Sequence, residues 1–139
     1  MKTQNAKNFT ERLDSENIKW TEMDNNGGRD RIRLIYGGDN KDPIVLHFMF
    51  DDDEETMSVR CFDLCTCPKN KMAKMLIALN RINAKYKWVN FYMDEDNDII
   101  AQVDMEVDPE TVGKTGRRTI SICVSVIDDA WPELQEALK

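Results

Sequence analysis

The chain has 139 residues with 26 acidic and 19 basic side chains, which gives a net charge of −7 at neutral pH. This length suits one domain, residues 1–139, with a sizeable core. The acidic balance argues against nucleic acid as a partner, because binding to phosphates needs a cationic surface. The first residues lack the apolar region of a signal peptide, and the longest apolar run, residues 43–50, is too short to span a bilayer. We therefore expect a cytoplasmic protein without membrane contact.

The first half of the chain predicts one short helix followed by a meander of antiparallel strands. Apolar side chains recur at helical spacing at Ala6, Phe9 and Leu13. Alternating apolar and polar side chains then predict strands at residues 18–23, 31–36, 44–50 and 57–61. Between the first two strands, Asn26-Gly27 is a strong hairpin signal, because both residues tolerate a positive φ.

The second half predicts a helix, a hairpin and a longer helix. Pro68 suits the first turn of a helix, and apolar residues continue after it at three- and four-residue spacings. Residues 89–93 and 99–107 alternate as paired strands, and residues 111–131 form the last helix, after which Pro132 starts a short tail. The order α-β-β-β(-β)-α-β-β-α lacks βαβ alternation. It predicts an α+β fold in which about three helices pack on an antiparallel sheet.

The last helix is apolar over more than half of its circumference. The stripe that we expect to face the sheet consists of Val112, Ile120, Val124, Ile127 and Trp131. Ile122 and Val126 widen this stripe, and a helix that is apolar so far round usually contacts more than one neighbour. We expect Ile122 and Val126 to face the first helix, the central helix or a second subunit, and we predict that they contribute to a symmetric homodimer.

Two acidic runs, residues 51–55 and 94–98, are interpreted as solvated turns. In the second run, carboxylates alternate from Asp94 as they do at the start of a calcium loop. A calcium loop of the EF-hand type requires Gly at its sixth position and Glu at its twelfth. This chain has Ile99 and Met105 there. We therefore assign no metal site to these turns, and only loose cation binding is left open.

Four cysteines, Cys61, Cys65, Cys67 and Cys123, raise the alternative of a thiol or metal sensor. In a cytosolic chain we expect them to be reduced. The first three are close in sequence, but their spacing does not match the paired ligands of a structural zinc site. Cys65 and Cys67 precede the central helix, and a helix N-terminus can lower the pKa of a nearby thiol. We assign no metal and no cofactor, and expect a structural role for the cysteines.

His47 is the one histidine of the chain and lies between Val45 and Met49 on the most apolar strand. The sequence contains no G-x-S-x-G motif that would supply a serine nucleophile. We interpret His47 as a half-buried strand residue with its hydrogen bonds satisfied. We predict no catalytic residue and no enzymatic activity.

Two short motifs within residues 70–139 carry a resemblance to a known family. The central helix ends in Leu79-Asn80-Arg81-Ile82-Asn83, and the last helix closes with Asp128-Asp129-Ala130-Trp131-Pro132-Glu133-Leu134. Together with the order of elements, these motifs resemble the YbjN-like family, described as bacterial sensory transduction regulators with a fold like that of type III secretion chaperones. The resemblance implies regulation or protein binding. It carries no catalytic or ligand-binding residue over to this chain.

We expect a non-enzymatic protein-binding module that acts as a homodimer in a regulatory or chaperone-like role and holds a segment of an unidentified protein or peptide. Exposed strand edges and apolar helix faces are surfaces that capture such segments. The net charge of −7 favours partners with basic surfaces. Two alternatives stay open. One is a small acidic inhibitor or immunity-type protein, and the other is a sensor built on Cys61, Cys65 and Cys67.

Overall fold

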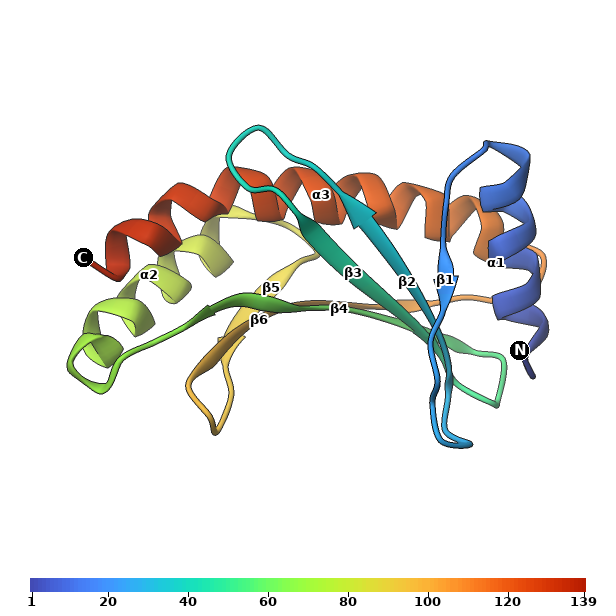
Figure 1. Ribbon diagram of the computed structural model, residues 1–139, viewed down its shortest axis with the longest axis horizontal. Helices are drawn as coiled ribbons and strands as arrows, with labels where there is room; N and C mark the ends of the chain where they lie inside the picture. The colour runs from blue at the N-terminus through green and yellow to red at the C-terminus, as the bar shows by residue number, and fades with distance from the viewer.

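Three helices and one six-stranded antiparallel sheet make up the chain, which confirms the predicted α+β class and order of elements (Figure 1). The computed structural model describes residues 1–139, except for the side chain of Asp63. The helices are α1 (Gln4–Ser15), α2 (Met72–Lys85) and α3 (Val112–Ala137), and a 3-10 turn, η1 (Lys69–Lys71), precedes α2. The strands are β1 (Thr21–Glu22), β2 (Asp30–Tyr36), β3 (Ile44–Phe50), β4 (Thr56–Thr66), β5 (Asn90–Met93) and β6 (Asp98–Glu106).

The strands follow the order β1-β2-β3-β4-β6-β5, so β1 and β5 are the edges of the sheet. In the part of the chain that the structure describes, all three helices pack on one face of the sheet. The long helix α3 extends across the molecule, with α1 near its start and α2 near its end (Figure 1). Among the described residues, no helix has both the length and the apolar character that crossing a membrane requires.

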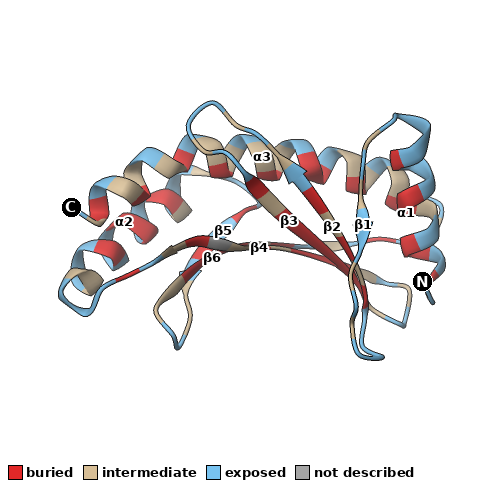
Figure 2. Cartoon of the chain, viewed as in Figure 1, coloured by how far each residue is buried: buried red, intermediate tan, exposed pale blue. Residues whose placement is uncertain are grey.

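The core lies between the helices and the face of the sheet that they cover (Figure 2). Alternate residues of β3 point into it, as the sequence pattern predicts, and the ring of Phe9 on α1 stacks on Phe48 with centroids 4.7 Å apart. α3 comes close to this stack at Gly116, where the position of an added Cβ is only 2.5 Å from ring atoms of Phe9. The glycine therefore allows α1, α3 and the sheet to meet.

The strand predicted at residues 18–23 is much shorter than expected, because only Thr21 and Glu22 pair with β2. The residues before them are used to end α1. The backbone N–H of Ile18 donates to the carbonyl of Leu13 at 2.9 Å, and the indole N–H of Trp20 donates to Asp14 at 2.8 Å. These local hydrogen bonds replace the pairing that the alternation of side chains had indicated.

The last helix does not end at Trp131 as predicted, but continues through Pro132 to Ala137. Proline lacks the N–H that would bond the carbonyl four residues earlier, which belongs to Asp128. The side-chain amide of Asn40, in the β2–β3 loop, donates to that carbonyl at 3.1 Å instead. The carboxylate of Asp128 also accepts from the backbone N–H groups of Asn40 and Lys41, at 2.7 and 2.9 Å. The loop thus compensates for the proline and is anchored to α3.

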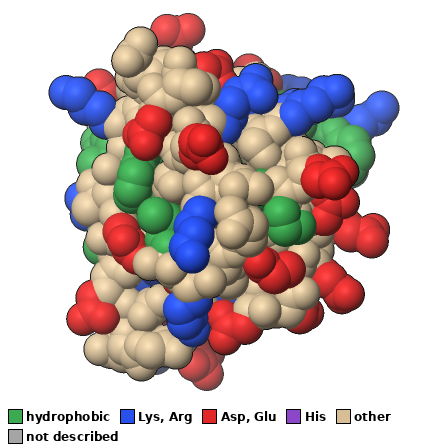
Figure 3. Space-filling view, turned by 90° about the vertical axis from the view of Figure 1, so that its right-hand side faces the viewer, with side chains coloured by type: hydrophobic (Ala, Val, Ile, Leu, Met, Phe, Trp, Pro, Cys, Tyr) green, Lys and Arg blue, Asp and Glu red, His purple; other side chains and the backbone are tan. Residues whose placement is uncertain are grey.

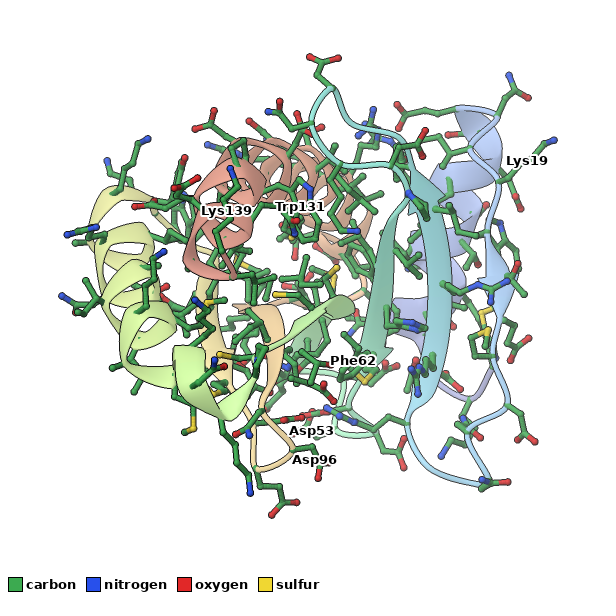
Figure 4. The ribbon with its side chains drawn as sticks, turned by 60° about the vertical axis from the view of Figure 1, so that its left-hand side comes forward. Lys19, Asp53, Phe62, Asp96, Trp131 and Lys139 are labelled. Carbon is green, nitrogen blue, oxygen red and sulfur yellow. The ribbon has the colours of Figure 1, made fainter. Side chains whose placement is uncertain are left out.

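The stripe of α3 that faces the sheet is shifted from the predicted one. Its buried residues are Val112, Gly116, Thr119, Ile120, Cys123, Ile127, Ala130, Leu134 and Ala137. Val124 and Trp131 lie beside this stripe and are only partly buried. Trp131, labelled in Figure 4, lies under the ammonium group of Lys41, 4.5 Å from its ring centroid. The small residues Cys123 and Ala130 belong to the buried stripe in their place.

Replacing Gly116 with alanine should lower the free energy of unfolding by about 1–3 kcal/mol, because the new methyl group would clash with the stacked ring of Phe9. Urea denaturation followed by circular dichroism measures this loss. Gly113→Ala is the matched control on the same helix. Its added Cβ would lie 3.3 Å from the nearest side-chain atom of Arg12, and alanine favours a helix over glycine by about 1 kcal/mol, so this variant should be at least as stable as wild type. Equal stabilities of Gly116→Ala and wild type would contradict the close packing.

Candidate functional site

An apolar groove opens where α3 passes the end of β6. Trp88, Met105 and Ile122 line it, Lys114 and Arg118 of α3 also border it, and its volume is about 370 Å³. β5 pairs with β6 only as far as Gln102, so the last residues of β6 have no strand partner on this side. The groove therefore combines apolar side chains with an unpaired stretch of strand, two features that recur in surfaces for protein binding.

Trp88 is the most unusual residue of the groove. Its side chain is 57% exposed, and its backbone has φ of 73°, in the left-handed region. It occupies the short connection between α2 and β5, where the N–H of Val89 donates to the carbonyl of Lys87 at 2.9 Å. A bulky residue in this conformation costs about 1–2 kcal/mol and is uncommon outside functional or tightly constrained sites. The connection thus holds a large aromatic ring at the surface, although a glycine would fit the backbone better.

The structure places Ile122 and Val126 on the flank of α3 that faces the connection between α2 and β5. Both side chains are partly buried and pack against the core. Ile122 lines the groove with Trp88, whereas Val126 borders a separate shallow depression beside Tyr86 and Asp129. The two predicted interface residues therefore share a flank but not a groove, and Ile122 has the larger apolar surroundings. A role of either residue in a homodimer stays a prediction.

The charged side chains that border the groove are basic. Lys114 and Arg118 lie on its α3 side. Asp104 and Glu106 alternate with the groove residue Met105 along β6, so they point to the opposite face of the sheet. The end of the molecule at α1 looks different, because acidic and basic side chains are interspersed there and hydrophobic ones form only small patches (Figure 3). The apolar groove with its basic border is thus a local feature of the region where α3 passes β6.

His47 is buried on the face of the sheet turned away from the helices. The Nε–H of Arg31 donates to its Nδ1 at 3.0 Å, and its ring lies 5.5 Å from that of Phe62. The guanidinium of Arg31 also lies over the Phe62 ring, 5.5 Å from the centroid. His47 is thus a satisfied strand residue, as predicted, although it is more buried than expected at 7% exposure.

The cysteines lack the lowered pKa that a helix N-terminus could give. Burial raises the pKa of Cys65 to about 11 and that of Cys123 to about 12, and it also raises the pKa of Cys67. The hypothesis of an activated thiol at Cys65 or Cys67 is therefore wrong, because desolvation of the thiolate outweighs any favourable dipole. None of the four cysteines forms a disulfide.

Within the part of the chain that the structure describes, one group of three or more potential metal ligands comes together, namely Asp94, Asp96 and Asp98. This group lies in the turn between β5 and β6, whose tip Figure 4 marks at Asp96. The carboxylate of Asp94 accepts from the backbone N–H groups of Asp96 and Asp98, both at 2.9 Å. The carboxylate therefore stabilises the turn, in agreement with the interpretation of this run as a solvated turn.

We predict that the native thiols react slowly with iodoacetamide, because only the thiolate is nucleophilic. At about pH 8 the rate should be at least about tenfold lower in the native protein than in urea, where the thiols return to a pKa near 8.5. As the pH rises, the native rate should increase toward pH 11, where Cys65 ionises. Rapid native alkylation of Cys65 or Cys67 at neutral pH would restore the sensor hypothesis.

The residues of the two short sequence motifs have structural roles. The side-chain amide of Asn83 donates to the carbonyl of Phe91 at 3.0 Å and accepts from its N–H at 2.8 Å. These two bonds satisfy backbone groups on the edge strand β5 and tie that strand to α2. In the second motif, Asp128 anchors the β2–β3 loop and Asp129 accepts from the hydroxyl of Tyr86. The motifs therefore stabilise the fold, and these residues do not line the groove.

Asn83→Ala should lower the free energy of unfolding by about 1–2 kcal/mol, because two backbone groups of Phe91 lose their partner. Asn80→Ala on the exposed face of the same helix is the matched control, and its stability should stay within about 0.5 kcal/mol of wild type. Urea denaturation compares the two variants. A loss of the same size in both would show that the helix, rather than the bonds to β5, determines the effect.

Comparison with known proteins gives a family and a fold. The profile of the YbjN family, described as "Putative bacterial sensory transduction regulator", matches residues 5–136. The crystal structure of YbjN from E. coli, described as "a putative transcription regulator", shares 16% identity with a TM-score of 0.55 and covers 90% of both chains. An uncharacterized protein from Methanothermobacter thermautotrophicus shares 15% identity with a TM-score of 0.62, over 97% of this chain and 99% of that chain.

No curated protein matches the sequence. At these identities the two crystal structures support the fold alone. The family profile, in contrast, covers nearly the whole sequence, including both motifs that Asn83 and Asp128 represent. The chain belongs to the YbjN family.

Proposed function

We propose that this protein is a non-enzymatic protein-binding module with a regulatory role, and that it forms a homodimer through the groove at Trp88 and Ile122. The observation that supports this proposal is the exposed Trp88, which is held in a left-handed backbone conformation beside Met105 and Ile122. Tryptophan is among the residues that contribute most to binding energy in protein interfaces. The regulatory role rests on the description of the family.

A second copy of the chain suits the groove because the centre of the groove is apolar. A two-fold axis brings the same patch of both subunits together, so the patch must be complementary to itself, and two apolar patches meet this condition. Trp88 of one copy can then cover Met105 and Ile122 of the other. Direct pairing of the two β6 edges is disfavoured, since Asp104 and Glu106 would face like charges across the strands. The contact should therefore involve the side chains of the groove.

The two alternatives fit these observations less well. A thiol sensor needs a reactive cysteine, whereas burial raises the pKa of Cys65, Cys67 and Cys123. An acidic inhibitor of a basic protein would bind through a surface of one sign, whereas Lys114 and Arg118 border the groove. A dimer that buries the apolar centre of the groove accounts for it better than either alternative.

Trp88→Gly should dissociate the dimer without unfolding the subunit. The glycine relieves the left-handed strain at this position and removes the exposed ring. A two-fold interface contains Trp88 twice, so a loss of about 2 kcal/mol per ring would raise the dimer dissociation constant about 1,000-fold. Sedimentation equilibrium at micromolar concentrations measures the constant, and urea denaturation should show a subunit at least as stable as wild type.

Leu76→Ala is the control, because Leu76 is 52% exposed on α2 outside the groove. It should leave the dissociation constant unchanged. The double variant Ile122→Asp with Val126→Asp tests the flank of α3 and should also give monomers. A monomeric wild type would refute the homodimer, and a dimer that survives Trp88→Gly would place the contact elsewhere.

A further inference from the structure

A polar row crosses the face of the sheet that the helices leave uncovered. The strand pairings place Thr21, Arg33, His47, Arg60, Gln102 and Asn90 side by side, one residue from each strand. Residues directly opposite one another in antiparallel strands have Cβ atoms about 4.5–5.5 Å apart. The row therefore forms one continuous strip. Its charged residues are Arg33 on β2 and Arg60 on β4.

A second row, two residues along each strand, is apolar. It consists of Ile35, Val45, Phe62, Ile100 and Tyr92, each two positions from a member of the polar row. Ile35 is 59% exposed and Tyr92 is 36% exposed. The open face of an antiparallel sheet normally carries polar side chains. Val45 and Phe62 are partly buried and Ile100 is buried, so the exposed apolar side chains are those at the two ends of the row, Ile35 and Tyr92. Exposed apolar side chains next to an arginine row are typical of a surface that binds a partner.

The arginines of this face differ in whether a carboxylate neutralises them. Arg29 pairs with Asp51 at 3.1 Å, and Arg60 pairs with Asp104 at 2.9 Å. Arg31 forms its hydrogen bond with His47 instead. The Nε of Arg33 is buried and has no hydrogen-bond partner among the described residues. A buried donor without an acceptor is costly. The residue as a whole is only partly buried, so an acceptor from outside the chain can still reach its guanidinium group.

We infer that this open face binds an acidic segment of a partner protein, with a carboxylate on Arg33 and apolar side chains on the row of Ile35 and Tyr92. The planar guanidinium of arginine matches a carboxylate with two parallel hydrogen bonds. A nucleic acid is a poorer occupant, because a long polyanion would also meet the acidic turns at residues 51–55 and 94–98. This surface lies on the opposite face of the sheet from the helices and is distinct from the groove at Trp88.

The test is fluorescence anisotropy with a labelled synthetic peptide that repeats Glu-Glu-Leu, and with a matched peptide that repeats Lys-Lys-Leu. The acidic peptide should bind the wild-type protein, and its affinity should fall as salt is added. Arg33→Gln should weaken binding about tenfold, because a charge-assisted hydrogen bond is lost. Arg81→Gln removes the same charge from the exposed surface of α2 and should leave binding unchanged.

Ile35→Ser provides a second variant in case Arg33→Gln fails to fold, since Ile35 is exposed and the substitution is tolerated easily. This variant should bind the acidic peptide more weakly than wild type, while its circular dichroism spectrum stays the same as that of wild type. The inference is overturned if the acidic peptide does not bind, or if Arg81→Gln lowers the affinity for this peptide as much as Arg33→Gln does. It is also overturned if only the lysine peptide binds, or if a single-stranded oligonucleotide binds more tightly and loses affinity in Arg33→Gln. The peptide readout is independent of the sedimentation experiment, so one proposal can fail without the other.

Discussion

Packing of all the helices on one face of the sheet determines which surfaces of this protein can bind a partner. α3 is held to that face by its buried stripe, and Gly116 allows it to touch the Phe9 ring that stacks on Phe48. α2 is tied to the same side through the bonds of Asn83 to β5. A sheet that is covered on one side presents its other side to solvent, and the side chains there need not fill a core. The arginine row and the exposed Ile35 are found on that side.

Short-range patterns in the sequence predicted most of the fold. The alternation of residues 44–50 and the spacing of apolar residues in α2 reflect which side chains face the core, and such patterns are strong in long elements. The errors occur where contacts between residues far apart in the sequence determine the local structure. Asn40 replaces the hydrogen bond that Pro132 cannot make, across 88 positions of the sequence. No local pattern indicates that a loop will compensate for a proline.

The candidate site was only partly predictable. Ile122 could be identified because it is apolar on a flank where polar residues would suffice. Trp88 was missed because its importance depends on its exposure and its left-handed backbone, and neither is visible in the residue type. The arginine row was also missed. Arg31 and Arg33 alternate visibly in the sequence, but only the register of the sheet places Arg33 in one row with His47 and Arg60.

The open face also changes what the net charge implies about partners. A charge of −7 predicts basic partners, but it sums groups that lie far apart. Salt screens exposed charges beyond about 10 Å at 0.1 M, so a partner in contact experiences the nearest charges only. Many acidic groups are concentrated in the turns at residues 51–55 and 94–98, and these turns lie at different ends of the sheet in Figure 1. At the open face, Arg31 bonds to His47 and the Nε of Arg33 has no partner, so neither arginine is neutralised by a carboxylate of the described residues. The negative total charge can therefore attract a basic partner from a distance, whereas the arginine row favours acidic groups that come into contact with it.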